Sequence, residues 1–116
     1  MEKELSKRII DELLTYLYSH EITEIRIGVE FAEERLFIEI QGTAETQPED
    51  LDVLADLLNN PRDPSMEIYY QELLGNPRHD REDYHLLGSL IDDVEIMYAQ
   101  PIINIKIFRR ASHSYY

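Results

Sequence analysis

Apolar and polar residues alternate one for one between residues 22 and 42, and this is the clearest pattern in the chain. The polar sequence Ala32-Glu33-Glu34-Arg35 interrupts the alternation and predicts a turn. Because successive side chains of a strand point to opposite faces, the two runs predict an antiparallel hairpin with one apolar face. A lone hairpin is marginal in water, so we expect helices to cover that face. The apolar positions are Ile25, Ile27, Val29, Phe31, Leu36, Ile38 and Ile40.

Residues 3–20, which precede the hairpin, have the periodicity of an amphipathic helix. Apolar side chains recur at every fourth position, and Arg8 and Glu12 lie mostly off the stripe that they form. The pattern therefore predicts a helix that packs directly on the hairpin. The stripe consists of Leu5, Ile9, Leu13 and Leu17, widened by Ile10, Leu14 and Tyr18.

Three further helices are predicted after the hairpin. The first has its apolar face at Leu51, Leu54, Ala55 and Leu58, and Asn59-Asn60-Pro61 ends it. Thr46 and Glu49 have the spacing of a capping box at its start. The other two helices are predicted over residues 63–75, which begin at Asp63-Pro64, and over residues 80–91, which contain Gly88.

The period returns to two near the end of the chain. Val94, Ile96 and Tyr98 alternate with Glu95 and Met97. After the turn at Ala99-Gln100-Pro101, Ile103, Ile105 and Ile107 alternate with Asn104, Lys106 and Phe108. We expect a ragged end from Arg109 onwards. The chain is therefore predicted to form one α+β domain over residues 1–110, with a disordered tail over residues 111–116. Its architecture is a two-layer sandwich with helices on one face of a mostly antiparallel sheet, in the order α-β-β-α-α-α-β-β.

One face of this sheet is left without a predicted cover. Phe37, Met97 and Phe108 are apolar, yet they occupy the otherwise polar positions of the two hairpins. Two interpretations stay open: these side chains are partly exposed, or they form the surface on which a second copy docks as a homodimer.

Charge narrows the classes of partner. The 116 residues include 24 acidic and 11 basic side chains, which gives a formal net charge of −13. Such a chain repels phosphate backbones and anionic lipid, so we expect neither nucleic acid nor membrane as a partner, and a basic protein partner fits better. Mimicry of DNA by the acidic surface is a minor alternative. The absence of cysteine, of a signal-peptide pattern and of a long apolar run predicts a soluble cytoplasmic protein.

The residue patterns contain no complete catalytic or metal-binding signature. His79 and His85 are six positions apart, which places them on different sides of a helix and predicts no metal site. None of the serines lies in a nucleophile elbow, and the glycines at positions 28, 42, 75 and 88 cannot form a G-x-G-x-x-G loop. Adjacent carboxylates are numerous enough to arise by chance in so acidic a chain. They include Glu33/Glu34, Glu49/Asp50 and Asp92/Asp93.

Three segments nevertheless resemble the ATP-binding domain of the GHKL superfamily, and within it the anti-sigma-factor serine kinases. Residues 12–20 are similar to the N-box helix, which carries a glutamate and, four residues later, a magnesium-binding asparagine. Residues 38–42 and 47–51 are similar to the strand and loop that hold the adenine. Residues 86–95 are similar to the glycine-bearing helix that closes on the phosphates.

The resemblance assigns roles that this chain fills only in part. It places Glu12 at the general base, but Tyr16 occupies the asparagine position, and a phenol is a poor substitute for an amide oxygen on magnesium. Gln41-Gly42 replaces the adenine-reading aspartate, and only Gly88 remains of the paired glycines. The resemblance therefore implies a degenerate, non-catalytic regulatory or protein-interaction domain without a cofactor. The alternative is an active ATP-dependent serine kinase or ATPase with Glu12 as base, Gly42 and Gly88 at the nucleotide, and ATP and magnesium as cofactors.

Overall fold

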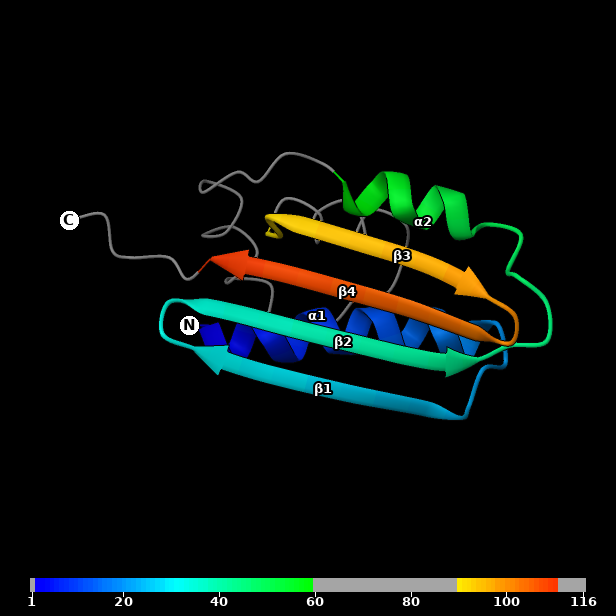
Figure 1. The fold of residues 1–116 in the computed structure, drawn as a ribbon, viewed down its shortest axis with the longest axis horizontal. Coiled ribbons are helices and arrows are strands. Elements are labelled where there is room, and N and C mark those ends of the chain that lie inside the picture. Colours follow the sequence, from blue (N-terminus) through cyan, green and yellow to red (C-terminus); the bar gives the residue numbers. More distant parts are fainter. Residues whose placement is uncertain (1, 60–89, 111–116) are drawn as a thin grey trace.

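The computed structural model describes residues 2–59 and 90–110, and these form an α+β fold. Helix α1 (Glu2–Ser19) is followed by strands β1 (Ile25–Ala32) and β2 (Arg35–Thr43), as Figure 1 shows. Helix α2 (Leu51–Leu58) and strands β3 (Asp93–Ala99) and β4 (Ile102–Arg110) complete the described elements. Both hairpins and the helices at either side of the first hairpin are therefore confirmed. The helices predicted over residues 63–75 and 80–91 lie outside the described residues, except for Leu90 and Ile91, which are not helical.

The four strands form one open antiparallel sheet in the order β1-β2-β4-β3. Because β4 lies between β2 and β3, the second hairpin pairs with the first through β4, which contacts β2. The register sets Ile38 beside Ile107 and Ile40 beside Ile105, so the apolar positions of β2 and β4 share one face. That face is the buried one, since all four of these side chains are almost completely covered.

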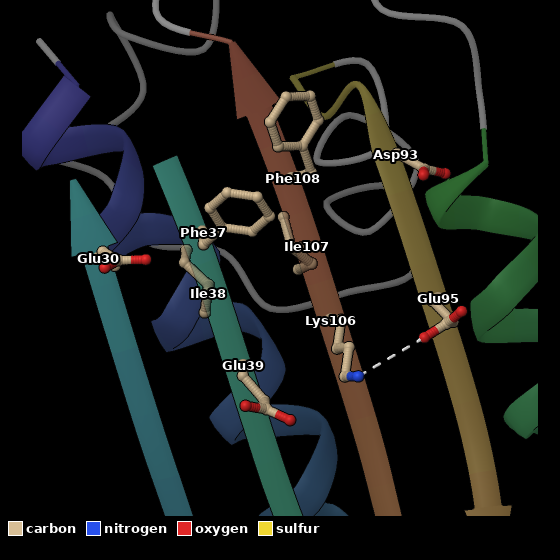
Figure 2. A pocket seen from close by; sticks show the side chains of 9 residues that line it. All are labelled: Glu30, Phe37, Ile38, Glu39, Asp93, Glu95, Lys106, Ile107 and Phe108. Carbon is tan, nitrogen blue, oxygen red and sulfur yellow. Dashed lines mark ion pairs between the residues drawn. The ribbon is translucent and has the colours of Figure 1, made fainter. Parts of the chain in front are cut away.

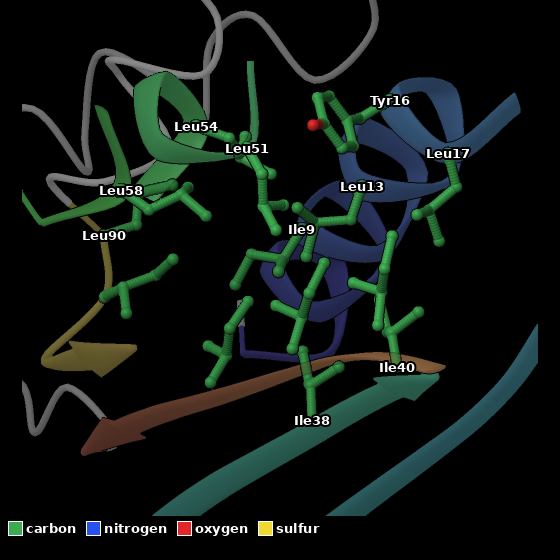
Figure 3. Packing of buried hydrophobic residues seen from close by; sticks show 14 of the residues in the cluster. Ile9, Leu13, Tyr16, Leu17, Ile38, Ile40, Leu51, Leu54, Leu58 and Leu90 are labelled. Carbon is green, nitrogen blue, oxygen red and sulfur yellow. The ribbon is translucent and has the colours of Figure 1, made fainter. Parts of the chain in front are cut away.

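Helices α1 and α2 pack on the same side of the sheet, where they bury a single hydrophobic core (Figure 3). Burying a leucine or isoleucine side chain stabilises the fold by roughly 1.5–3 kcal/mol, so this layer supplies most of the driving force for folding. The hydrophobic residues with the least exposure are Leu5, Ile9, Leu13, Leu17, Leu36, Ile38, Ile40, Leu54, Leu58, Leu90, Ile91, Ile103, Ile105 and Ile107.

Two local predictions are corrected. Helix α2 has Asp50 at its N-cap position with no side-chain cap, so the capping box of Thr46 and Glu49 is wrong. The expected ragged end at Arg109 is also wrong, because β4 continues to Arg110 and the Arg109 side chain is fully buried. Residues 111–116, the predicted tail, lie outside the described residues.

The described residues include no helix that has both the length and the apolar composition needed to cross a membrane.

Candidate functional site

A row of polar side chains follows one side of α1 at intervals of four residues: Arg8, Glu12, Tyr16 and His20. Arg8 and Glu12 are buried, with 3.1 Å between the arginine Nη2 and the glutamate Oε1. The prediction that these two residues lie off the buried stripe is therefore wrong. Their opposite charges allow them to be buried together, since an ion pair offsets part of the desolvation cost of each group.

The C-terminal half of this row meets Asp50, the residue just before α2. The Tyr16 hydroxyl donates a hydrogen bond to Asp50 Oδ1 at 2.8 Å, and His20 Nε2 lies 2.9 Å from the same oxygen. The two rings also touch, with 4.7 Å between their centroids. These contacts explain why Asp50 does not cap α2: its carboxylate is directed to α1 instead. The cluster thus joins the end of one helix to the start of the other.

Tyr16 fills space within the core. Its side chain is only 4% exposed and lies among the leucines of α1 and α2 (Figure 3). Its hydroxyl acts as a donor to Asp50, so the phenol does not offer an oxygen in the way that a magnesium-binding asparagine does. Glu12, the candidate base, has no exposed surface and approaches Arg8. Within residues 2–59 and 90–110, no three potential metal-ligating side chains gather at one point.

Of the two glycines that the resemblance places at the nucleotide, Gly42 lies in the described part of the chain and Gly88 does not. Gly42 is buried in β2, where a Cβ atom would lie 2.8 Å from Cγ2 of Ile22 and 3.8 Å from Leu17 Cδ2. The bare backbone at this position therefore allows close packing inside the protein. Gly88 lies outside the described residues, as do His79 and His85.

The second candidate site lies on the sheet face opposite the helices. Phe37 of β2 and Phe108 of β4 are neighbours in register, and their ring centroids are 5.1 Å apart (Figure 2). Phe37 is 42% exposed, and Met97 on the same face is 52% exposed. Of the two interpretations, partial exposure is confirmed for these two side chains, and docking of a second copy on this face stays a prediction. The Phe37–Phe108 pair borders a depression of about 390 Å³.

Acidic side chains lie beside this aromatic pair and in the row of the sheet on one side of it, whereas Arg35 and Arg110 form the row on the other side. In the row of the sheet next to the pair, Lys106 lies between Glu39 and Glu95, and its Nζ is 3.9 Å from Glu95 Oε1. Glu39 in turn accepts a hydrogen bond from Asn104 Nδ2 at 3.1 Å. We call this surface the acidic aromatic face. It consists of Phe37 and Phe108, the carboxylates of Glu30, Glu39, Asp93 and Glu95, and the ammonium group of Lys106, all of which line the depression.

The chemistry of this face is that of a binding surface. The partly exposed aromatic rings supply apolar contact area, and around the depression four carboxylates accompany one ammonium group and attract basic groups. The sequence pattern identified the aromatic residues of this face but not the carboxylates that lie near them. The signal was present, because Glu39 and Glu95 occupy the same outward positions of their strands as Phe37 and Met97. What the pattern lacked was the strand order, which brings these positions into adjacent rows.

Comparisons with known proteins gave no relative: no protein-family model matches the chain, and no curated protein or solved structure matches it.

Proposed function

We propose that this chain is a small, non-catalytic regulatory domain that binds a basic protein partner through its acidic aromatic face. The observation that carries the proposal is the Phe37–Phe108 pair, in which Phe37 is 42% exposed and Phe108 partly exposed, beside a depression lined by four carboxylates. Aromatic rings are enriched at the centres of protein interfaces, where they contribute much of the binding energy. The carboxylates would select a partner of opposite charge and raise its rate of association.

The helix side of the sheet supports a role without nucleotide. In the GHKL resemblance, Glu12 and the residue four positions later would face magnesium and ATP. Here the Tyr16 ring is packed in the hydrophobic core, and its hydroxyl donates a hydrogen bond to Asp50. The net charge of −13 also opposes the binding of a nucleoside triphosphate. We therefore propose a degenerate GHKL-like scaffold that has lost nucleotide binding, located in the cytoplasm.

A peptide titration followed by NMR tests the binding face. The probe is a short soluble peptide of alternating lysine and leucine, which presents both a basic and an apolar side. We expect amide shifts centred on Phe37, Glu39 and Phe108. A peptide of alternating lysine and serine should cause much smaller shifts, because it lacks the apolar contacts.

Matched charge variants locate the interaction. The double variant E39Q/E95Q removes two carboxylates from the acidic aromatic face, whereas E21Q/E45Q removes two from exposed positions elsewhere. We expect the first to weaken binding of the lysine–leucine peptide several-fold and the second to change it much less. Equal losses in both variants, or shifts centred away from this face, would contradict the proposal.

Calorimetry with ATP and magnesium tests the enzyme alternative directly. The proposal predicts no binding heat from the full chain. Binding of ATP, or turnover, would overturn the non-catalytic function. If turnover is found, its loss in the variant E12Q would assign Glu12 as the general base.

A further inference from the structure

Strand β1 lies at one edge of the sheet and exposes apolar side chains on the helix side. Ile27, Val29 and Phe31 are 40%, 44% and 48% exposed. Their neighbours in β2, which share the same face, are almost completely buried. In the part of the chain that the structure describes, the helical layer therefore covers β2 and β4 but leaves β1 open. Proteins usually protect a long apolar edge strand, because it can pair with another chain.

The backbone of the same residues is directed outward. The amide of Thr43 donates to the carbonyl of Glu24 at 3.1 Å, which places Glu24 among the residues that bond to β2. Backbone groups alternate in direction along a strand, so the even-numbered residues of β1 bond to β2. The odd-numbered residues, Ile25, Ile27, Val29 and Phe31, consequently direct their N–H and C=O groups away from the sheet. Apolar side chains and hydrogen-bonding groups are thus available together.

We propose that β1 pairs antiparallel with β1 of a second copy, around a two-fold axis at Gly28. In this register Ile27 lies opposite Val29 of the second copy, and Ile25 lies opposite its Phe31. These are odd-numbered pairs, so their outward backbone groups can exchange hydrogen bonds. The apolar side chains of both copies then meet on the helix side, and two four-stranded sheets become continuous.

Charge complementarity selects this register. It places Arg26 opposite Glu30 of the second copy, and the two-fold axis repeats the pair, so each copy contributes one cation and one anion. Moving the axis to Ile27 would instead oppose Glu24 and Glu30, which repel each other. Moving it to Val29 would set Arg26 opposite Ala32, without a partner charge. In a chain of net charge −13, this placement of an arginine reduces the repulsion between copies at the contact.

Gly28 leaves room at the axis itself. A Cβ atom built at this position has no atom within 4 Å. Two strands can therefore approach closely here, and a side chain added at this position meets no obstacle within its own chain. This pairing leaves Phe37 and Phe108 uncovered, so the dimer would present two acidic aromatic faces side by side.

Sedimentation equilibrium of the full chain is the first test. We expect a concentration-dependent mass that approaches twice that of one chain. V29K should shift the equilibrium to monomer at least ten-fold, because it places a charge at the centre of the contact. V53K is the matched control, since Val53 on α2 has similar exposure at 42% and should leave dimerisation unchanged.

Disulfide formation tests the register, which is practical because the chain has no cysteine of its own. G28C should form a covalent dimer under mild oxidation, since Cα atoms in a non-hydrogen-bonded antiparallel pair are about 4.5 Å apart, within disulfide range. E30C alone should not, because its two copies would be about 13 Å apart along the strands. A mixture of R26C and E30C should form the mixed disulfide.

Two results would overturn the proposal. One is a wild-type chain that stays monomeric at all concentrations, whether or not the variants fold. In that case, slow amide exchange at Ile27 and Val29 would indicate that another segment of the same chain covers β1. The other is a dimer that persists in V29K and in which G28C fails to cross-link, because the contact would then lie elsewhere.

Discussion

Arg109 and Glu2 are joined by two hydrogen bonds although they are 107 residues apart in the chain. The guanidinium donates from Nε and Nη2 to the two carboxylate oxygens, at 2.7 and 2.8 Å. Its Nη1 donates to the carbonyl of Leu90 at 2.7 Å. One buried side chain of β4 therefore connects the start of α1 with the segment that enters β3. Bidentate pairs of this kind are stronger than neutral hydrogen bonds.

Replacing Glu2 with alanine should lower the free energy of unfolding by about 2 kcal/mol, because a buried guanidinium loses its carboxylate partner. Glu4→Ala is the matched control in the same helical turn, where the side chain is exposed and the expected loss is about 0.5 kcal/mol or less. Urea unfolding of both variants measures the difference. Equal losses of stability would show that the ion pair of Glu2 with Arg109 contributes no more than any carboxylate in the first turn of α1.

Tyr16→Phe should destabilise the fold by about 1 kcal/mol, since it removes the hydrogen bond to Asp50 while keeping the ring in the core. Tyr18→Phe, on the exposed side of the same helix, should leave the unfolding midpoint unchanged. Thermal unfolding monitored by circular dichroism compares the two variants. A Tyr16→Phe protein as stable as wild type would mean that the Asp50 contact is energetically neutral.

Gly42→Ala should cost about 1–3 kcal/mol, because the new methyl group would overlap Ile22 Cγ2 in the core. Gly28→Ala is the natural control, with open space around the added atom, and should be neutral or slightly stabilising. Chemical unfolding of the two variants tests the contrast. If Gly42→Ala were tolerated as well as Gly28→Ala, the tight packing of β2 against Ile22 would be disproved.

Glu33→Gly should stabilise the first hairpin by about 0.5–1 kcal/mol. Glu33 has a φ of 56°, a left-handed conformation that glycine adopts without the steric cost that other residues incur. Glu34→Gly should bring no gain, because among the described non-glycine residues only Glu21 and Glu33 have positive φ. The midpoints of urea unfolding report both changes, and a gain at position 34 rather than 33 would refute the assignment.

The alternation of apolar and polar residues predicted all four strands and the turn at Glu33-Glu34, because the two-residue period reflects backbone geometry alone. It could not predict how much of each strand the helices cover. Ile27 and Ile40 are opposite each other and look equivalent in sequence, yet only Ile40 is buried. The difference comes from the position of β1 at the edge of the sheet, which depends on strand order.

Buried charges were the other feature beyond the reach of the sequence pattern. Arg8, Glu12 and Arg109 look like solvated residues, since charged side chains are almost never buried unless they are paired. Arg109 is buried through contacts with a residue at the opposite end of the sequence, and no local window contains both partners. The contact of Tyr16 with Asp50 escaped detection for the same reason.

The central place of β4 has a consequence for how the chain is made. The first helix and hairpin leave the ribosome early, but β2 gains its second neighbour only when the final strand arrives. Until then, Ile38 and Ile40 belong to an incomplete sheet with an open apolar edge. A nascent chain that stalls before residue 102 would therefore be a substrate for chaperones, since it lacks β4, the strand that lies between β2 and β3.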